Sequence, residues 1–381
     1  RYFKKLFMKI TLLTSNTSIE DLPRTRTLYN LLKENFELEV ISIIRKKEKI
    51  ENYKNEFPNF KEIKFDFGTI FKDLIKNVSG DIIYALKTKP ASFGLATSLK
   101  NHKKIPVILD IDAIEPYNCY PYSSNNLKNF SLSIFQFNNP NSFIYTWLLE
   151  RRIKFADDIT ISSPFLQKIY GGTFIPNACD TNFFNPEKYK RDEIRSYMGW
   201  NDLKIILFSG TVNQSIDLEI LINAVKELNN PEIKIVIAGE MSSGLKKSIL
   251  NESSVSLIES QPQLNIAKLI TASDLFVLPL KNIAPGQGKL SANLFEAMAG
   301  ELPIISTNIF DMPDILTECG IVTPVGNVES LKNNIKKVFS DRQFAKEIGK
   351  KARQKCINQY SKQQIEKKLN DFFKKFEYKS L

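Results

Sequence analysis

Short apolar runs alternate along the chain with stretches of helical spacing, and this rhythm occurs twice. In the first half, strands are predicted at residues 9–15, 37–44, 81–86, 106–111 and 159–162, and helices at 25–35 and 93–99. After a break at 185–202, strands at 204–208, 234–238, 275–279 and 303–306 alternate with helices at 218–228, 267–271 and 290–299. Alternating strands and helices predict parallel sheets covered on both faces. The pattern therefore predicts an α/β protein with two Rossmann-like domains, 1–188 and 200–361, facing a central cleft.

The two ends of the chain have distinct patterns. Near the C-terminus, apolar residues at helical spacing form one stripe opposite a basic face, namely Ile365, Leu369, Phe372, Phe373 and Phe376. At the N-terminus, lysines precede an apolar run, but Lys9 interrupts it, so a first strand fits better than a signal peptide. Met8 begins that strand, and whether residues 1–7 belong to the natural chain stays open. No run approaches the roughly 18 apolar residues of a membrane span.

Length and charge narrow the picture. The chain has 381 residues, which suits two domains, and a net charge of +11. Residues 1–185 contribute 26 basic against 19 acidic side chains (+7), and the remainder 27 against 23 (+4). This spread fits either a solvated surface or attraction to nucleotide sugars, lipid phosphates or an anionic membrane face. Because no basic stripe carries aromatics in register, nucleic-acid binding is not predicted.

Several familiar kinds of site are missing from the sequence. It has neither GxGxxG nor GxxxxGK[ST], and its single histidine, His102, lies in a polar loop. Its four cysteines form no CxxC pair, which favours free thiols in a reducing cytoplasm. Without a cluster of metal ligands, we expect no required metal and no cofactor.

The segment 284–300 is the most informative, because a Gly-rich loop follows a predicted strand and leads into a helix. Gly286 and Gly288 allow backbone to approach a ligand, and the start of the helix attracts anions. Lys289 adds a positive charge, and Glu296, seven residues later, lies on the same helical face. A pyrophosphate at the helix start and a ribose on Glu296 would suit this arrangement. An ordinary Gly-rich loop with a surface glutamate stays an alternative.

Six segments together resemble retaining glycosyltransferases of family four, the glycosyl transferases group 1. They are residues 272–279, 294–305, 208–211, 237–240, 175–180 and 21–26. The resemblance implies a GT-B fold, with a nucleoside-diphosphate sugar as co-substrate in the second domain and the helix 362–381 packed back on the first. The implied donor-binding residues are Gly210, Thr211, Gly239, Glu240, Gly286, Gly288, Lys289, Leu290 and Glu296. The implied acceptor-side residues are Arg24 and Asn177.

The chain departs from the family pattern at the phosphate-binding positions. Gly288 occupies the place of the first glutamate of the EX7E pattern, although Lys289 resembles a basic variant of that motif. Asn293 stands where that variant often has a second lysine, and residues 212–215 lack the usual basic pair. Phosphate binding is therefore expected to depend on Lys289 and backbone N–H groups.

Asp110 and Asp112 are the candidate catalytic residues. Both follow the predicted strand 106–111, at the end where parallel sheets place ligands. The family often has a histidine in this stretch, which is absent here. A loop-capping role for each aspartate stays an alternative.

Residues 118–145 are rich in Asn, Ser, Phe and Tyr and fall where the first domain is expected to contact the acceptor. They form either buried core or an amphipathic lip for a lipid-linked acceptor or membrane surface. The family resemblance thus implies a retaining, hexosyltransferase-like enzyme of cell-surface polysaccharide or glycoconjugate biosynthesis. It would act on a glycan or lipid-linked acceptor in the cytoplasm, with peripheral contact at the inner face of the membrane as an option. A nucleotide-sugar epimerase and a non-catalytic partner of an active transferase are the alternatives.

Overall fold

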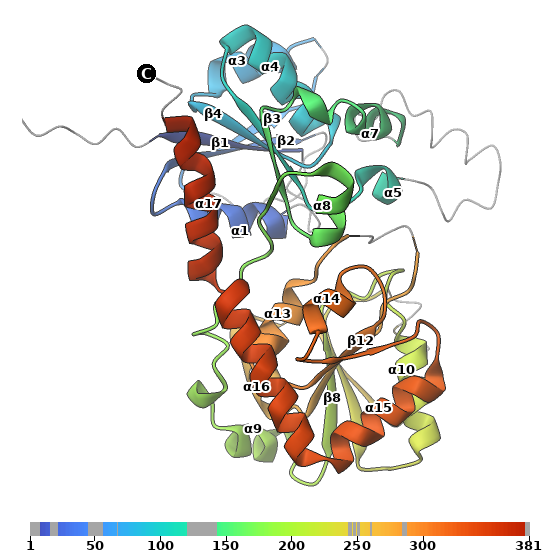
Figure 1. Ribbon diagram of the computed structural model, residues 1–381. Coiled ribbons are helices and arrows are strands. Elements are labelled where there is room, and N and C mark those ends of the chain that lie inside the picture. The colour runs from blue at the N-terminus through green and yellow to red at the C-terminus, as the bar shows by residue number, and fades with distance from the viewer. Residues whose placement is uncertain are drawn as a thin grey trace, which may run out of the picture. The chain divides into compact units, whose positions relative to one another are not determined.

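The computed structural model divides by its internal contacts into two units (Figure 1). It describes residues 8–15, 22–44, 56–66, 68–119, 143–242, 246, 249, 252–259, 261–283 and 288–377. One unit contains the described residues up to Pro176 together with 288–289 and 365–377. The other contains those of 177–283 and 290–364.

The first unit is built on a seven-stranded sheet in the order β3-β2-β1-β4-β5-β6-β7, whose neighbouring strands all pair in parallel. Its strands are β1 (Lys9–Thr14), β2 (Glu37–Ile44), β3 (Phe60–Lys64), β4 (Ile82–Leu86), β5 (Val107–Ile111), β6 (Asp158–Ile161) and β7 (Thr173–Phe174). Its helices are α1 (Leu22–Leu32), α3 (Ile70–Asn77), α4 (Leu95–Lys103), α5 (Glu115–Cys119), α7 (Phe143–Glu150) and α8 (Pro164–Tyr170), with a π-helical turn at Pro90–Gly94 and a 3-10 turn at Ile153–Phe155.

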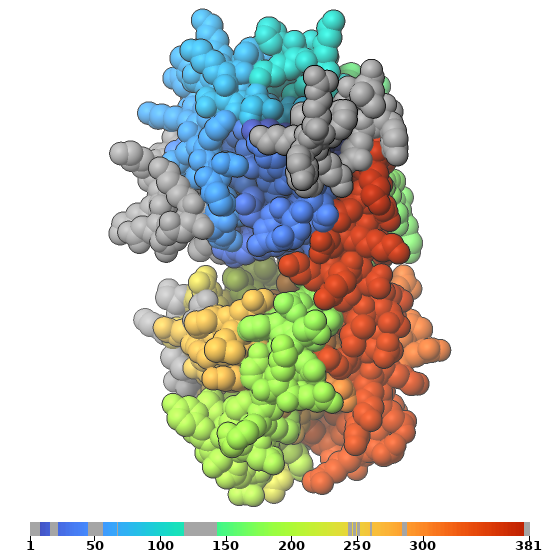
Figure 2. All heavy atoms as spheres, turned by 90° about the vertical axis from the view of Figure 1, so that its left-hand side faces the viewer, coloured from blue at the N-terminus to red at the C-terminus, as the bar shows by residue number. Residues whose placement is uncertain are grey.

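Apolar strands explain why this sheet is covered on both sides. One face packs Leu13, Ile83 and Leu109 against residues of α3 and α4 in a single core. On the other face, the ring of Tyr84 meets Phe373 of the C-terminal helix α17 (Lys362–Glu377) at 5.4 Å. Phe36, after α1, also meets Phe373, at 5.5 Å. Figure 2 shows the C-terminal residues, in red, against the blue N-terminal residues.

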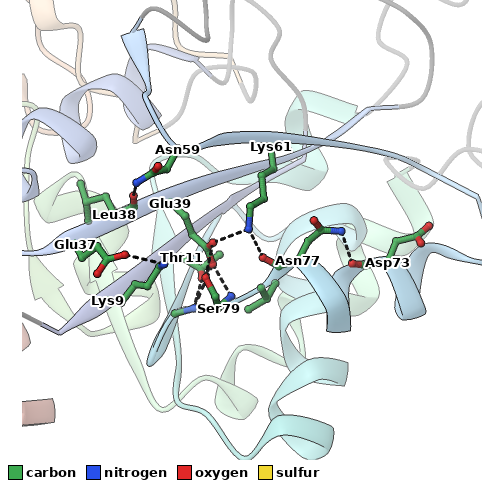
Figure 3. A network of polar contacts seen from close by, with 12 residues as sticks. Lys9, Thr11, Glu37, Leu38, Glu39, Asn59, Lys61, Asp73, Asn77 and Ser79 are labelled. Carbon is green, nitrogen blue, oxygen red and sulfur yellow. Dashed lines mark hydrogen bonds and ion pairs between the residues drawn. The ribbon is translucent and has the colours of Figure 1, made fainter.

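A buried carboxylate joins the amino-terminal ends of four strands in the first unit (Figure 3). Glu39 of β2 accepts hydrogen bonds from Thr11 Oγ1 of β1 at 2.5 Å and from Lys61 Nζ of β3 at 3.1 Å. Before β4, the backbone N and Oγ of Ser79 and the backbone N of Gly80 also donate to it, at 2.7, 2.8 and 3.2 Å. We call this group the Glu39 network, and it fixes how these strands begin.

The second unit has a six-stranded sheet in the order β10-β9-β8-β11-β12-β13, again with parallel pairing. Its strands are β8 (Lys204–Ser209), β9 (Ile233–Ala238), β10 (Val255–Ile258), β11 (Leu275–Leu278), β12 (Ile304–Thr307) and β13 (Ile321–Thr323). Its helices are α9 (Arg191–Met198), α10 (Leu218–Leu228), α12 (Gln263–Ala272), α13 (Ala292–Ala299), α14 (Met312–Leu316), α15 (Val328–Ser340) and α16 (Arg342–Gln359), with a 3-10 turn at Pro186–Lys188.

Two parallel sheets with helical connections confirm the predicted α/β fold of two Rossmann-like units. In both sheets the strand order reverses at a central strand, β1 or β8, and ligands of such sheets bind beyond the carboxyl ends at that point. Among the described residues, no helix combines the length and apolar character needed to span a bilayer.

Candidate functional site

Two glycines meet at the carboxyl ends of β8 and β9, where the second sheet reverses its strand order. Gly210 follows β8 with φ 128°, and Gly239 follows β9 with φ 155°, a backbone conformation that side chains disfavour. A Cβ at Gly239 would lie only 2.0 Å from the carbonyl oxygen of Gly210, so only glycine fits here. The two backbones therefore pack directly against each other beyond β8 and β9.

The start of α13 lies beside this glycine pair. Asn293 Nδ2 donates to Ser209 Oγ at 3.3 Å, and a Cβ at Gly210 would lie 3.1 Å from Asn293 Oδ1. The N-cap residue Ser291 makes no side-chain cap and bonds Asn293 Oδ1 instead, at 3.1 Å. The first N–H groups of α13 therefore have no cap from Ser291, and they carry the positive end of the helix dipole.

Glu296 is the carboxylate of this cluster and is half-buried. Asn293 Nδ2 lies 3.5 Å from its Oε2, and Gln263 of α12 donates a second side-chain hydrogen bond. Burial raises the pKa of Glu296 to about 7, although the bond from Gln263 opposes that rise. Near neutral pH, Glu296 is therefore present both as a carboxylate, which can accept hydrogen bonds from two hydroxyl groups, and as the neutral carboxylic acid.

The other predicted donor residues occupy varied surroundings. Thr211 and Glu240 are exposed beyond β8 and β9. Leu290 is buried, and its carbonyl accepts a hydrogen bond from Asn177 Nδ2 at 3.0 Å. Gly286 lies outside the described residues. Gly288, which has φ 75°, and the exposed Lys289 belong to the first unit, whereas Glu296 belongs to the second.

In the first unit, the structure places Asp110 and Arg24 together in the interior. Asp110 is 0% exposed and receives both Nε and Nη2 of Arg24, at 2.9 and 2.7 Å. Thr160 Oγ1 donates at 2.7 Å and Tyr84 Oη at 3.3 Å, while Arg24 Nη2 also bonds the carbonyl of Ile175 at 2.7 Å. The charge of Asp110 and its hydrogen bonds hold the pKa of Arg24 above its ordinary value despite burial. This arrangement favours a structural role for both, and their predicted roles in catalysis and acceptor binding stay predictions.

Asp112 has very different neighbours, although it is only two residues further on. Its Oδ1 lies 3.7 Å from Lys87 Nζ and has no hydrogen-bond partner in the described part of the chain. Lys87 Nζ also lies 3.6 Å from Glu115 Oε1, and Lys89 Nζ lies 3.8 Å from Glu115 Oε2. Burial, with a further contribution from the charge of Glu115, raises the pKa of the neighbouring Glu150 to about 7.

Several of these polar residues were not predicted from the sequence. Ser209, Gln263, Lys87 and Glu115 were not singled out, and Asn293 was noted only as a departure from the family. The rule that ligands lie beyond strand ends would have found Ser209 and Lys87, since both adjoin the ends of apolar runs. Within the described ranges, no three His, Cys, Asp or Glu side chains are placed to hold a metal ion.

Comparison with known proteins gives a family match over part of the chain and a fold match over nearly all of it. Residues 190–355 match the family model described as glycosyl transferases group 1. The chain is 25% identical over 207 residues to spore coat protein SA of Bacillus subtilis, covering 50% of this chain and 54% of that protein. The match thus spans about half the length of this curated relative.

Solved structures resemble nearly the whole chain. The HepE protein of Anabaena, crystallised in complex with UDP, has a TM-score of 0.74 at 15% identity, covering 97% of this chain and 100% of that one. A glycosyltransferase from Rickettsia africae has a TM-score of 0.71 at 14% identity, covering 97% and 98%. These likenesses show the GT-B fold, and the match over 190–355 supports a glycosyltransferase.

Proposed function

We propose that this protein transfers a hexosyl-type sugar, with retention, from a nucleoside-diphosphate sugar to a glycan or lipid-linked acceptor. Cell-surface polysaccharide or glycoconjugate synthesis is the proposed setting. The carrying observation is the cluster of Glu296, Asn293 and Gly210, at the point where the second sheet reverses its strand order. The match over 190–355 supports it, as does the UDP bound in the HepE structure.

In this proposal, each group of the cluster has a stated role. Glu296 accepts hydrogen bonds from both ribose hydroxyls, and the start of α13, which has no side-chain cap, faces the diphosphate. Lys289 stays the basic residue that the sequence predicts for phosphate binding. The bond between the sugar C1 and the diphosphate oxygen breaks, and its electron pair leaves with the diphosphate. A bond forms from C1 to the acceptor oxygen, whose proton goes to the departing diphosphate. The protein's part is to position both substrates and to stabilise the leaving charge.

Calorimetry with UDP tests the donor site. Replacing Glu296 by Ala should weaken UDP binding by about 1–3 kcal/mol, the range for hydrogen bonds to a charged group. Lys289→Ala should weaken it as well. The matched control is Glu219→Ala, an exposed glutamate in the first turn of α10. Unchanged affinity in both Glu296→Ala and Lys289→Ala would remove this site.

Product analysis separates the alternatives. Incubation with UDP-hexoses and candidate glycans should give a transferred sugar whose anomeric configuration, read by NMR, matches that of the donor. An altered sugar still attached to UDP would indicate an epimerase, and UDP binding without any product a non-catalytic partner. We propose that no metal is needed, so transfer should continue in EDTA.

The proposed membrane contact draws on a patch around the end of α7. Leu148 and Phe155 are 42% and 51% exposed, and Arg152 and Lys154 beside them are exposed too. Both basic residues and Phe155 line a pocket of about 410 Å³. Apolar side chains flanked by cations suit an anionic membrane surface. Most of the predicted lip, residues 120–142, lies outside the described residues.

Co-sedimentation with phosphatidylglycerol vesicles tests this contact. Binding should fall as salt rises, because screening shortens the reach of surface charge. It should fall again in a Leu148→Ser/Phe155→Ser variant. The control is Leu264→Ser, since Leu264 is 46% exposed on α12 of the other unit. Equal sedimentation of all three proteins would exclude the patch.

A further inference from the structure

Three polar side chains beyond neighbouring strands of the first sheet are buried without hydrogen-bond partners. Thr88 follows β4, Asp112 follows β5 and Ser162 follows β6. They are only 1%, 7% and 1% exposed. In the described part of the chain, Thr88 Oγ1, Asp112 Oδ1 and Ser162 Oγ have no hydrogen-bond partner. We call these three residues the strand-end row.

The sheet register places the row abreast. Leu86 pairs with Asp110, and Ile111 pairs with Ile161. Counted on from the last paired residues, this register aligns Asp112 with Ser162 and leads towards Thr88, which follows the turn at Lys87. The N–H of Ser162 still donates to the carbonyl of Ile111, at 3.1 Å, so the strands remain adjacent there. Two strand spacings span about 10 Å, which is comparable to the length of a sugar ring with its hydroxyl groups.

The backbone at the row is held in a costly conformation. Lys87 has φ 68°, which is uncommon for a residue with a side chain, and it is buried. Its N–H donates to the carbonyl of Asp110 at 2.8 Å, and its own carbonyl accepts from Ser92 Oγ at 3.0 Å. Such strain persists where the surroundings enforce it, and it is common at ligand sites.

In the described part of the chain, ion pairs beside the row join two lysines to two carboxylates. Lys87 and Lys89 carry two positive charges, and Asp112 and Glu115, which they approach within 3.6–3.8 Å, carry two negative charges. A site for phosphate requires a surplus of cations or of N–H donors. These pairs bring equal numbers of both charges, which suits hydroxyl groups, since they both donate and accept.

We propose that Thr88, Asp112 and Ser162 form a subsite for the neutral, hydroxyl-bearing part of the acceptor. This inference rests on the proposed transferase function. Asp112 Oδ1 accepts a hydrogen bond from one hydroxyl of the ligand. The hydroxyls of Thr88 and Ser162 form hydrogen bonds with neighbouring hydroxyls of the same ligand. Lys87 is a positioning residue that keeps the Asp112 carboxylate in place.

Saturation-transfer NMR on the full chain tests the subsite with neutral probes. The probes are the methyl glycosides of glucose, galactose, mannose and N-acetylglucosamine, compared with glucose 1-phosphate. At least one neutral glycoside should bind more strongly than the phosphate. Ser162→Ala, Thr88→Val and Asp112→Asn should each weaken that binding about tenfold, as expected for one lost hydrogen bond to a ligand. Affinity for UDP should not change.

Stability and a matched control distinguish a subsite from a structural role. Because their hydroxyls have no partners, Ser162→Ala and Thr88→Val should leave the unfolding midpoint unchanged or raised. Ser42 is the control, since its buried Oγ in β2 is also without a partner but lies within a strand. Ser42→Ala should bind the glycoside like the unaltered protein.

Three results would overturn the subsite: no neutral glycoside binds, none of the three variants weakens binding, or Ser42→Ala weakens it equally. UDP calorimetry is independent of these measurements. If UDP does not bind while a neutral glycoside does, the proposed transferase function fails and the subsite stands.

Discussion

The two ends of the first sheet treat buried polar groups in opposite ways. In the Glu39 network, at the amino-terminal ends, one carboxylate receives five hydrogen bonds from four residues. In the strand-end row, beyond the carboxyl ends, Thr88, Asp112 and Ser162 are also buried, and in the described part of the chain each has a side-chain oxygen without a hydrogen-bond partner. Both groups belong to the same parallel sheet, so the difference does not arise from the kind of sheet.

This difference separates architecture from binding. A buried polar atom without a partner costs about 1–3 kcal/mol, so a protein keeps several together only where something else supplies their partners. A fully partnered group instead holds elements together. By this criterion, Asp110 belongs with Glu39, although it sits beside the strand-end row, because four donor atoms from three residues satisfy its carboxylate.

The largest expected effect comes from Asp110. Asp110→Asn leaves the buried guanidinium of Arg24 without its counter-charge and should destabilise the first unit by about 3–5 kcal/mol. Asp112→Asn, two residues away, should cost less, because Lys87 keeps Glu115 as a second carboxylate partner at 3.6 Å. Urea unfolding can be followed by the fluorescence of Trp147 in a Trp200→Phe background, because the chain has two tryptophans.

A double variant keeps this comparison interpretable if Asp110→Asn folds poorly. Arg24→Met/Asp110→Asn removes both charges and should recover part of the lost stability. If Asp110→Asn instead abolished transfer while unfolding normally, Asp110 would be catalytic, as the sequence predicted, and the criterion of partnered groups would fail.

A smaller effect is expected from Glu39. Burial by itself would raise the pKa of Glu39, but hydrogen bonds from Thr11 and Ser79 hold it below the ordinary 4.5. A lowered folded-state pKa contributes stability that is present above pH 4.5 and is lost as pH falls through the folded-state pKa. Glu39→Gln should therefore cost about 2–3 kcal/mol at neutral pH, and the difference should shrink in acid.

Unfolding curves from pH 7 down to pH 3 measure this difference with the same Trp147 reporter. Glu37→Gln, at an exposed and singly paired glutamate of the same strand, is the control and should have little effect. If the difference in unfolding free energy between the unaltered protein and Glu39→Gln were the same at all pH values, the charge of Glu39 would not be what stabilises the beginnings of these strands.

The fold followed closely from the apolar pattern. Strand 37–44 and helix 218–228 were predicted with the bounds that the structure has, because both have strong periodicity. Strands β3, β7, β10 and β13 were missed. They lie at or near the sheet edges, are short, and contain half-buried or exposed residues, so their apolar signal is weak.

The candidate site was only partly accessible to sequence reasoning. Glu296, Gly286 and Gly288 could be proposed from the sequence because their motif is local and lies on one strand, loop and helix. The strand-end row could not, since Thr88, Asp112 and Ser162 are separated by 24 and 50 residues and meet only through the sheet register. Nor does a sequence show whether the oxygens of a buried aspartate have hydrogen-bond partners, which is the difference between Asp110 and Asp112.

The smallest expected effect concerns Glu296, which extends the comparison to the second unit. Its raised pKa of about 7 means that the folded protein binds the proton more tightly than the unfolded chain, whose glutamates titrate near 4.5. Stability of the second unit should therefore fall as pH rises from about 4.5 to 7. Glu296→Gln should remove this fall and make the unit more stable at pH 8, by about 1–2 kcal/mol because the half-buried side chain is partly screened by solvent.

The same variant should bind UDP less well, which links the cost in stability to binding. Trp200 fluorescence in a Trp147→Phe background reports the unfolding, and calorimetry at pH 8 reports the affinity. Glu219→Gln, an exposed glutamate of α10, controls for the loss of one negative charge. A Glu296→Gln protein that is less stable at pH 8 and binds UDP normally would place Glu296 with Glu39 and Asp110, among the groups that hold the fold rather than a ligand.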